Sequence, residues 1–260
     1  MKAPQMPRFK FQLSRQVKVM IMVGMVFVSI GFVEKRQADR VCNRIVIQVD
    51  NQYENFFIDE SDVMALMTEG GKDFIVGSAY KNIDLRHLEQ RIEEHRFIQN
   101  AEVFHDPKGN LLVRAKQSRP IARLVRSHAP DAYVSDLGQI LPVSERYTAR
   151  VLLISGSLVD SLITRDLSSY RRGRRFFEFL EYINNDPFWS AQIAQIDIEP
   201  DGEMNFYTTV SKQLVEFGTV ENYQDKFQRL HIFYKRILPQ KGWNEYERVS
   251  LKFKGQIVCE

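Results

Sequence analysis

Cysteine is scarce in this sequence, and its scarcity limits the sites that the chain can build. Only Cys42 and Cys259 occur among the 260 residues. A structural zinc site needs more cysteine or histidine ligands than this pair supplies. An oxidising compartment would permit a disulfide, but the two residues stand near opposite ends of the part that reads as folded. We therefore predict two free thiols and no metal site.

Catalytic and cofactor-binding patterns are missing as well. The histidines lack metal-ligand spacing to one another, to cysteine or to carboxylates; they are His87, His95, His105, His128 and His231. Ser155 and Ser157 lie in ISGS, which is not the G-x-S-x-G pattern of an activated serine. Gly70-Gly71 is not followed by the Lys-Ser/Thr of a phosphate-binding loop. We expect no catalytic residue, no cofactor and no enzymatic activity.

Basic residues show no excess in the body of the chain. The whole sequence has 36 basic and 33 acidic residues. Five of the 36 lie within the first 33 residues, which hold no acidic residue, so the remainder has 31 basic and 33 acidic side chains. A nucleic-acid-binding protein concentrates basic residues on its folded body. We expect no nucleic-acid partner.

One long apolar run is present, from Val19 to Val33, and it contains no charge. It reaches 17 residues if Val17 is included and Lys18 extends toward the headgroups, and spanning a bilayer takes about 17–25. We predict a membrane anchor at 17–33, after a cytoplasmic tail at 1–16. The basic tail keeps the N-terminus in the cytoplasm, which leaves residues 34–260 outside.

Two other interpretations of the apolar run are weaker. A cleaved signal peptide needs small residues after the run, but EKRQADRVC follows, and a lipoprotein site at Cys42 would need small apolar residues in place of DRV. A buried soluble helix would show a polar face. Residues 34–44 are then expected to be a linker.

Residues 45–118 read as one small domain. The alternation in RIVIQVDN predicts a strand. Asp59 or Ser61 can cap a short helix, and Asp84 can cap a second one in which Leu88 and Ile92 share an apolar stripe while Glu89, Glu93 and Glu94 face solvent. FIQNAEVFHD and LLVRAKQ, joined by PKGN, predict a hairpin. The predicted order is β-α-α-β-β.

Residues 119–260 read as an α+β domain with a mainly antiparallel sheet and packed helices. RRFFEFLEYINN and VENYQDKFQRLHIFYKRIL have helical spacing. In the second helix we expect Thr219 as the cap and Pro239 with Gly242 as the stop. Its apolar stripe is predicted to be core, and comprises Tyr223, Phe227, Leu230, Tyr234 and Ile237.

The order of these motifs resembles a known family. HLEQRIEEHRFIQNAEVFHDPKGNLLVRAKQSRPIARL resembles a POTRA domain. AYVSDLGQILPVS, VLLISG, IAQIDIEPDGEMNFYTT and VEFGTVENYQDKFQRL follow in the order of the bacterial cell-division family FtsQ/DivIB. The resemblance covers the whole chain. It implies a single-pass protein of the cell inner membrane, mainly periplasmic and located at the division septum, that recruits other division proteins without being an enzyme.

The same resemblance implies a partner site in the last strands. VSLKFKGQIVCE predicts a hairpin with Lys254-Gly255 as its turn, in which Ser250 faces Cys259. An open sheet edge can receive a partner strand, and in FtsQ proteins these strands receive a segment of FtsB, in a complex with FtsL. Carried over by position, the candidate contacts are Lys252, Phe253, Gln256, Ile257 and Val258. The POTRA domain would take contacts with other division proteins.

Other hypotheses stay open. The basic run Arg171–Arg175 is either the solvated start of a helix or a contact for an acidic partner or anionic headgroups. The C-terminal edge can also fray or be covered by a loop. The chain can instead be a POTRA-bearing component of an envelope transport or secretion system, or, less favoured, an anchored cell-wall enzyme.

Overall fold

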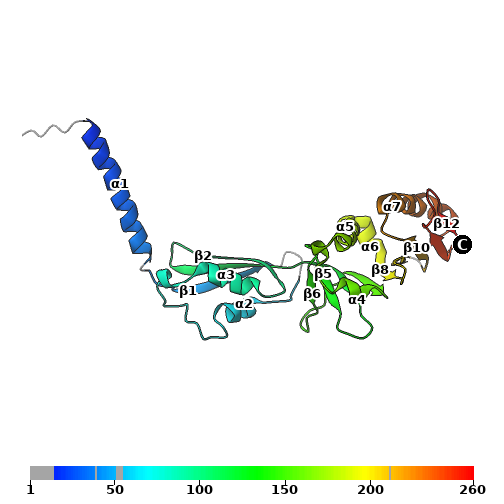
Figure 1. The fold of residues 1–260 in the computed structure, drawn as a ribbon, viewed down its shortest axis with the longest axis horizontal. Helices are drawn as coiled ribbons and strands as arrows, with labels where there is room; N and C mark the ends of the chain where they lie inside the picture. The colour runs from blue at the N-terminus through cyan, green and yellow to red at the C-terminus, as the bar shows by residue number, and fades with distance from the viewer. Residues whose placement is uncertain (1–14, 39, 51–54, 211) are drawn as a thin grey trace, which may run out of the picture.

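The computed structural model describes residues 15–38, 40–50, 55–210 and 212–260. Its first element is the helix α1, Arg15–Ala38, which contains the predicted anchor segment and projects away from the rest of the chain (Figure 1). Apolar side chains such as Met20, Phe27 and Val28 are 69–74% exposed on it. In the part of the chain that the structure describes, no helix meets the combined length and apolarity of a membrane span. The predicted tail, residues 1–16, lies almost entirely outside the described residues.

The next domain has the predicted β-α-α-β-β order. Its elements are β1 Arg44–Asp50, α2 Glu60–Met67, η1 Tyr80–Asn82, α3 Leu85–Glu93, β2 Ile98–His105 and β3 Asn110–Gln117. The sheet order is β1-β3-β2, with β1 parallel and β2 antiparallel to β3. The central place of β3 explains why the first half of the strand has buried or half-buried side chains on both faces.

Local sequence signals account for these elements. Asp59 caps α2 and forms a capping box with Asp62. At the start of α3, the Asp84 carboxylate accepts a hydrogen bond from the His87 amide. The β2–β3 turn is closed by Asp106, whose carboxylate accepts the Lys108 and Asn110 amides at 2.8 Å. Predicted capping and hairpin formation are both confirmed here.

The predicted solvent exposure of the glutamates is confirmed for Glu93 and Glu94, whereas Glu89 is half-buried, and two of the three carboxylates also bind the sheet. Glu89 accepts the Val103 amide at 2.8 Å, and Glu93 accepts the Ala101 amide at 3.0 Å. Both amides belong to β2, which lies at an edge of the three-stranded sheet. The carboxylates therefore occupy backbone donors that an edge strand would otherwise offer to another strand.

The larger domain contains one mixed, mainly antiparallel sheet of nine strands. In space their order is β12-β11-β10-β9-β8-β7-β4-β5-β6. The strands are β4 Pro120–Leu124, β5 Ala132–Ser135, β6 Ile140–Pro142, β7 Leu152–Gly156, β8 Ile193–Ile198, β9 Met204–Thr208, β10 Leu214–Gly218, β11 Arg248–Ser250 and β12 Val258–Cys259. Pairing is parallel between β4 and β7, β7 and β8, and β10 and β11, and antiparallel elsewhere.

Helices α5 Arg171–Asn185, α6 Pro187–Gln192 and α7 Tyr223–Ile232 lie along one side of this sheet (Figure 1). The other helical segments of this domain are α4 Val159–Leu162, η2 Leu167–Ser169, the π-helical η3 Phe233–Ile237 and α8 Leu238–Lys241. Phe179 of α5 lies within 5.6–6.1 Å, between ring centroids, of Phe206, Phe217 and Phe227. This aromatic cluster joins both long helices to the sheet.

The predicted stripe of the last helix is confirmed with one exception. Phe227, Leu230 and Tyr234 are buried and Tyr223 packs partly against the core, but Ile237 is 36% exposed. Ile237 turns outward because the helix widens into the π-helical η3 before Pro239. A proline lacks an amide hydrogen and crowds the carbonyl four residues earlier, and a π-helical turn accommodates such an interruption.

The predicted start of this helix is wrong, and its predicted stop is confirmed at Gly242 but not at Pro239. The residue at the N-cap of α7 is Asn222, which has a left-handed φ of +53°. The Thr219 hydroxyl accepts a hydrogen bond from the Glu221 amide at 3.4 Å, before the helix begins. Pro239 does not stop the helix, because α8 continues through it to Gly242. Gly242 adopts φ +113° and ends the helical segment.

The two domains share a packed junction. Phe57, just before α2, stacks on Phe97 at 4.4 Å and meets Tyr133 of β5 and Tyr147 edge-on at 5.9 and 5.0 Å. Arg146 pairs with Asp62 at 2.5 Å. The buried side chains of Tyr133, Leu141 and Ala149 thus belong to the core of the smaller domain.

Candidate partner-binding edge

The C-terminal segment differs from the predicted tight hairpin. Ser250 pairs with Val258, and Val249 pairs with Cys259, so the register is one residue away from the predicted Ser250–Cys259 pairing. Residues 251–257 form the connection between β11 and β12, in which Gly255 adopts φ +68°. The two-residue turn at Lys254-Gly255 is therefore wrong.

Arg229 of α7 accounts for this longer connection. Its Nη1 atom donates to the Phe253 carbonyl at 3.0 Å and also to the Gln256 carbonyl. Its Nε atom pairs with Asp225 at 3.0 Å, one helical turn away. A single guanidinium therefore binds two carbonyls of the connection and holds it against α7. These residues do not continue the pairing of β11 with β12.

The backbone of β12 has one open side. Arg248 and Glu260 exchange amide–carbonyl hydrogen bonds at 3.1 and 3.0 Å, which directs the Glu260 backbone toward β11. Neighbouring residues of an antiparallel strand alternate in direction, so the backbone amide and carbonyl of Cys259 point away from β11. Among the described strands, β12 pairs with β11 alone.

The five predicted contact residues divide into three environments. The Lys252 ammonium pairs with Glu203, and this hydrogen bond raises the pKa of Lys252. Phe253 is 56% exposed, and Gln256 beside it is also exposed. Ile257 packs partly against the core, while Val258 is 37% exposed on the opposite face.

Both cysteines are free thiols, as predicted. Cys42 is buried in the smaller domain, and Cys259 is partly buried on the core side of β12. Burial raises the pKa of each thiol. Since a thiolate is the reactive form, both side chains are poor nucleophiles at neutral pH.

Sequence reasoning missed a row of side chains on the sheet face opposite α5 and α7. Cross-strand pairing aligns Leu153, Gln195, Tyr207, Leu214 and Arg248 from β7 to β11. The period-2 alternation of each strand was the signal for this face. Its exposed members are Leu153 at 37%, Tyr207 at 46% and Arg248, so the row extends from the junction toward the β12 edge.

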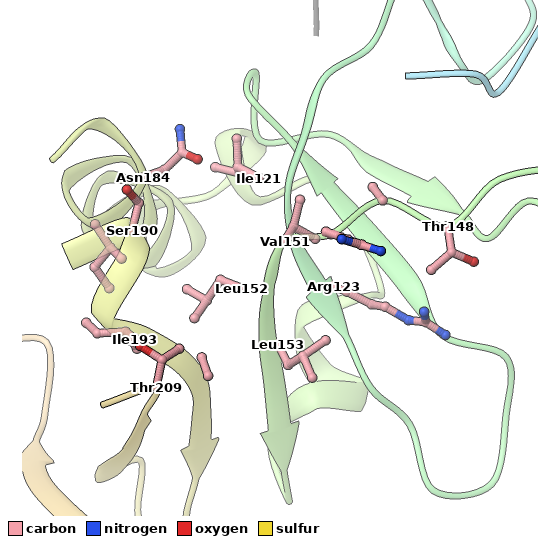
Figure 2. A pocket seen from close by; sticks show the side chains of 14 residues that line it. Ile121, Arg123, Thr148, Val151, Leu152, Leu153, Asn184, Ser190, Ile193 and Thr209 are labelled. Carbon is pink, nitrogen blue, oxygen red and sulfur yellow. The ribbon is translucent and has the colours of Figure 1, made fainter. Parts of the chain in front are cut away.

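A hollow of about 500 Å³ lies beside this row, between β7 and the start of β8. Figure 2 shows Val151, Leu152 and Ile193 on its walls, with Arg123 at one side. Arg123 is paired with Asp131 at 2.7 Å. The lining residues that the structure describes include no carboxylate, histidine or cysteine. They supply hydroxyl and guanidinium groups but no acid–base pair.

The basic run forms the start of α5, where its four arginines are exposed. Gly173 within it is buried, and a Cβ atom there would lie 2.5 Å from the Leu167 carbonyl oxygen. The glycine therefore allows α5 to pack closely on η2.

Comparisons with known protein families cover both domains. Residues 119–260 match the family model for FtsQ/DivIB, C-terminal related. Residues 40–116 match a POTRA-like domain. A comparison with curated proteins finds no match. Because the first family model covers more than half of the sequence, the chain belongs to the FtsQ/DivIB C-terminal related family.

Proposed function

We propose that this protein is a non-enzymatic, membrane-anchored scaffold of bacterial cell division. Membership of the FtsQ/DivIB family supports a role in division, and the POTRA-like domain fits a protein that binds other division proteins. In this proposal the POTRA-like domain spans 45–118 and the β domain spans 119–260. The first recruits division proteins, and the second binds an FtsB-like partner together with FtsL.

The anchor of this scaffold is the apolar part of α1, residues 17–33. The support is an apolar helix whose described side chains have no protein cover over most of its length. Exposed apolar surface of this extent is typical of membrane or partner contact. The N-terminus is then cytoplasmic, and both domains lie outside the inner membrane at the septum.

The observation that carries the partner site is the open side of β12. Its outward Cys259 backbone offers one amide and one carbonyl for strand addition, and the Val258 and Phe253 side chains flank it at 37% and 56% exposure. The contact residues in this proposal are Lys252, Phe253, Gln256, Ile257 and Val258. β12 has only two residues, so a partner strand that paired with β12 alone would make few hydrogen bonds. If residues 253–257 were released from Arg229, the partner strand would pair with them as well.

The test compares two valine substitutions in the full chain. Val258→Asp places a charge at the edge, and Val143→Asp places the same charge at an equally exposed valine, 37% in both cases, just after β6 at the opposite end of the sheet. We expect Val258→Asp to weaken binding of FtsB- and FtsL-like proteins at least about tenfold in a pull-down or titration, and Val143→Asp to leave binding unchanged. Equal binding by both variants would overturn the edge proposal.

Point substitutions are sharper here than a truncation. Deleting residues 249–260 would also remove Val249 and Leu251, which are fully buried in the sheet core. Loss of binding by that truncation would follow from unfolding as well as from loss of the edge. Val258 and Phe253 are exposed, so replacing them leaves the core intact.

A further inference from the structure

Three exposed apolar side chains gather at the end of the POTRA-like domain where α1 joins it. Phe74 is 85% exposed, Val76 54% and Val41 48%. We name these three residues the membrane foot. Phe74 is among the most exposed large apolar residues in the described chain, and nothing in the described part of the smaller domain covers it. An exposed aromatic residue of this kind calls for a partner surface.

Backbone hydrogen bonds hold the foot in place. The Gly77 amide donates to the Cys42 carbonyl at 2.8 Å, and the Cys42 amide donates to the Ser78 carbonyl at 2.9 Å. Val41 forms a bridge with Ala79. Ile75, between Phe74 and Val76, is buried in the domain core, so its two neighbours are directed outward.

The foot lies close to the end of the proposed anchor. Val41 follows Val33, the end of the proposed anchor, by eight residues. Five of these continue α1 to Ala38, about 7.5 Å along the helix, and the last three span at most about 11 Å. η1, which continues directly from Ala79, also contacts α1. Figure 1 shows the smaller domain directly at the end of α1. If α1 crosses a bilayer, this end of the domain faces the membrane surface.

The charges around the foot suit an anionic lipid surface. Arg40, Lys72 and Lys108 are exposed nearby, and Arg40 is held to the β2–β3 turn through the Pro107 carbonyl at 3.1 Å. Two of the described carboxylates nearby are already engaged. Asp73 pairs with Arg91 at 2.8 Å, and Asp106 accepts amides of its own turn.

We propose that Val41, Phe74 and Val76 insert into the interfacial layer of the leaflet that faces the two domains, with the surrounding basic residues on anionic headgroups. Aromatic and aliphatic side chains beside basic residues favour this layer. This inference rests on the proposed anchoring by α1. Its consequence is a second contact with the membrane, which fixes the tilt of the POTRA-like domain relative to the bilayer.

The test places a fluorescent reporter in the foot. The full-length Phe74→Trp variant is reconstituted into phosphatidylethanolamine/phosphatidylglycerol vesicles, with and without lipids brominated near the top of the acyl chains. We expect Phe74→Trp to show blue-shifted emission and to lose emission in brominated vesicles. The native Trp189 and Trp243, both in the β domain, are subtracted by measuring the unsubstituted chain.

The matched control is Phe253→Trp, because Phe253 is 56% exposed in the β domain. Its emission should be equal in brominated and unbrominated vesicles. Vesicle flotation separates the two proposals. If Phe74→Trp floats while its added emission stays unquenched and unshifted, the foot is overturned and the trio is left as a protein-binding surface. A chain that does not float overturns both the anchor and the foot.

Discussion

Arg229 Nη1 donates to the backbone carbonyl of Phe253 at 3.0 Å, across 24 residues of sequence. The same atom binds the Gln256 carbonyl, so one side chain of α7 sets the path of the segment between β11 and β12. Arg229 is largely covered, with 14% of its side chain exposed. The conformation of the proposed partner segment is thus controlled from a helix.

Replacing Arg229 should loosen this segment without unfolding the sheet. We expect Arg229→Ala to speed amide hydrogen exchange at residues 253–257, because two carbonyl contacts are lost, while β10 stays protected. Asp225→Ala is the control, since it removes only the ion pair with Arg229. Unchanged exchange at 253–257 in Arg229→Ala would show that the contacts do not hold the segment.

Gly156 should be the least replaceable of the glycines in the sheet. A Cβ atom there would lie 2.1 Å from the Ile198 carbonyl oxygen, and its φ is +110°. We expect Gly156→Ala to lower the free energy of unfolding by about 3 kcal/mol or more in urea titration.

Gly71→Ala provides the comparison for this effect. Gly71 has φ +94°, but an added Cβ would meet nothing within 4 Å. Gly71→Ala should lower the free energy of unfolding by about 1 kcal/mol, the cost of the backbone strain alone. Similar costs at both positions would mean that the close approach of β7 to β8 is not what requires Gly156.

At the junction, packing should contribute more than the ion pair. Phe57 is 4% exposed and surrounded by aromatic rings, so Phe57→Ala should cost about 3–5 kcal/mol. Arg146 and Asp59 are 49% and 56% exposed, so solvent screens their ion pair and Arg146→Ala should lower the free energy of unfolding much less than Phe57→Ala. Denaturant titration of both variants checks the order, and a larger effect of Arg146→Ala would reverse the assignment.

Acid should weaken the POTRA-like domain through His105 and His95. Burial lowers the pKa of both imidazoles below the ordinary value of 6.5, and His105 also stacks on Tyr80 at 3.6 Å between ring centroids. Because the unfolded chain then binds protons more readily, stability is full above pH 6.5 and falls as the pH drops through the folded pKa values.

Thermal unfolding between pH 7.5 and pH 5 measures this loss. We expect His105→Gln to reduce the decrease in melting temperature on acidification, since one titrating group is removed. His128→Gln, at an exposed turn position, should keep the full decrease. A pH dependence that is the same in all three proteins would exclude His105 as a contributor.

Much of the fold could be predicted because its signals are local. The caps at Asp59 and Asp84, the Asp106 turn and the stripe through Phe227 and Leu230 each depend on residues within about one turn of helix or hairpin. The β-α-α-β-β order and the α+β class follow from them. The order of the motifs also predicted the family.

Contacts between distant segments could not be predicted in the same way. Arg229 binds the segment 251–257 and changes its path. The amides of β2 donate to the carboxylates of Glu89 and Glu93, contacts that the helical pattern alone does not predict. The helix continues through Pro239, because a π-helical turn before it accommodates a residue that has no amide hydrogen to donate. The five candidate contact residues and the anchor remain predictions for the experiments above.

The nine-stranded sheet has a consequence for reach. Tyr133 of β5 is locked into the core of the POTRA-like domain, and β12 is seven strand steps away in the same hydrogen-bonded sheet. At about 4.8 Å a step, the separation is about 34 Å. Such a sheet therefore fixes the spacing between its two ends. A partner bound at β12 is held at a set distance from the smaller domain, and a force on that edge is transmitted through the interstrand hydrogen bonds to the junction.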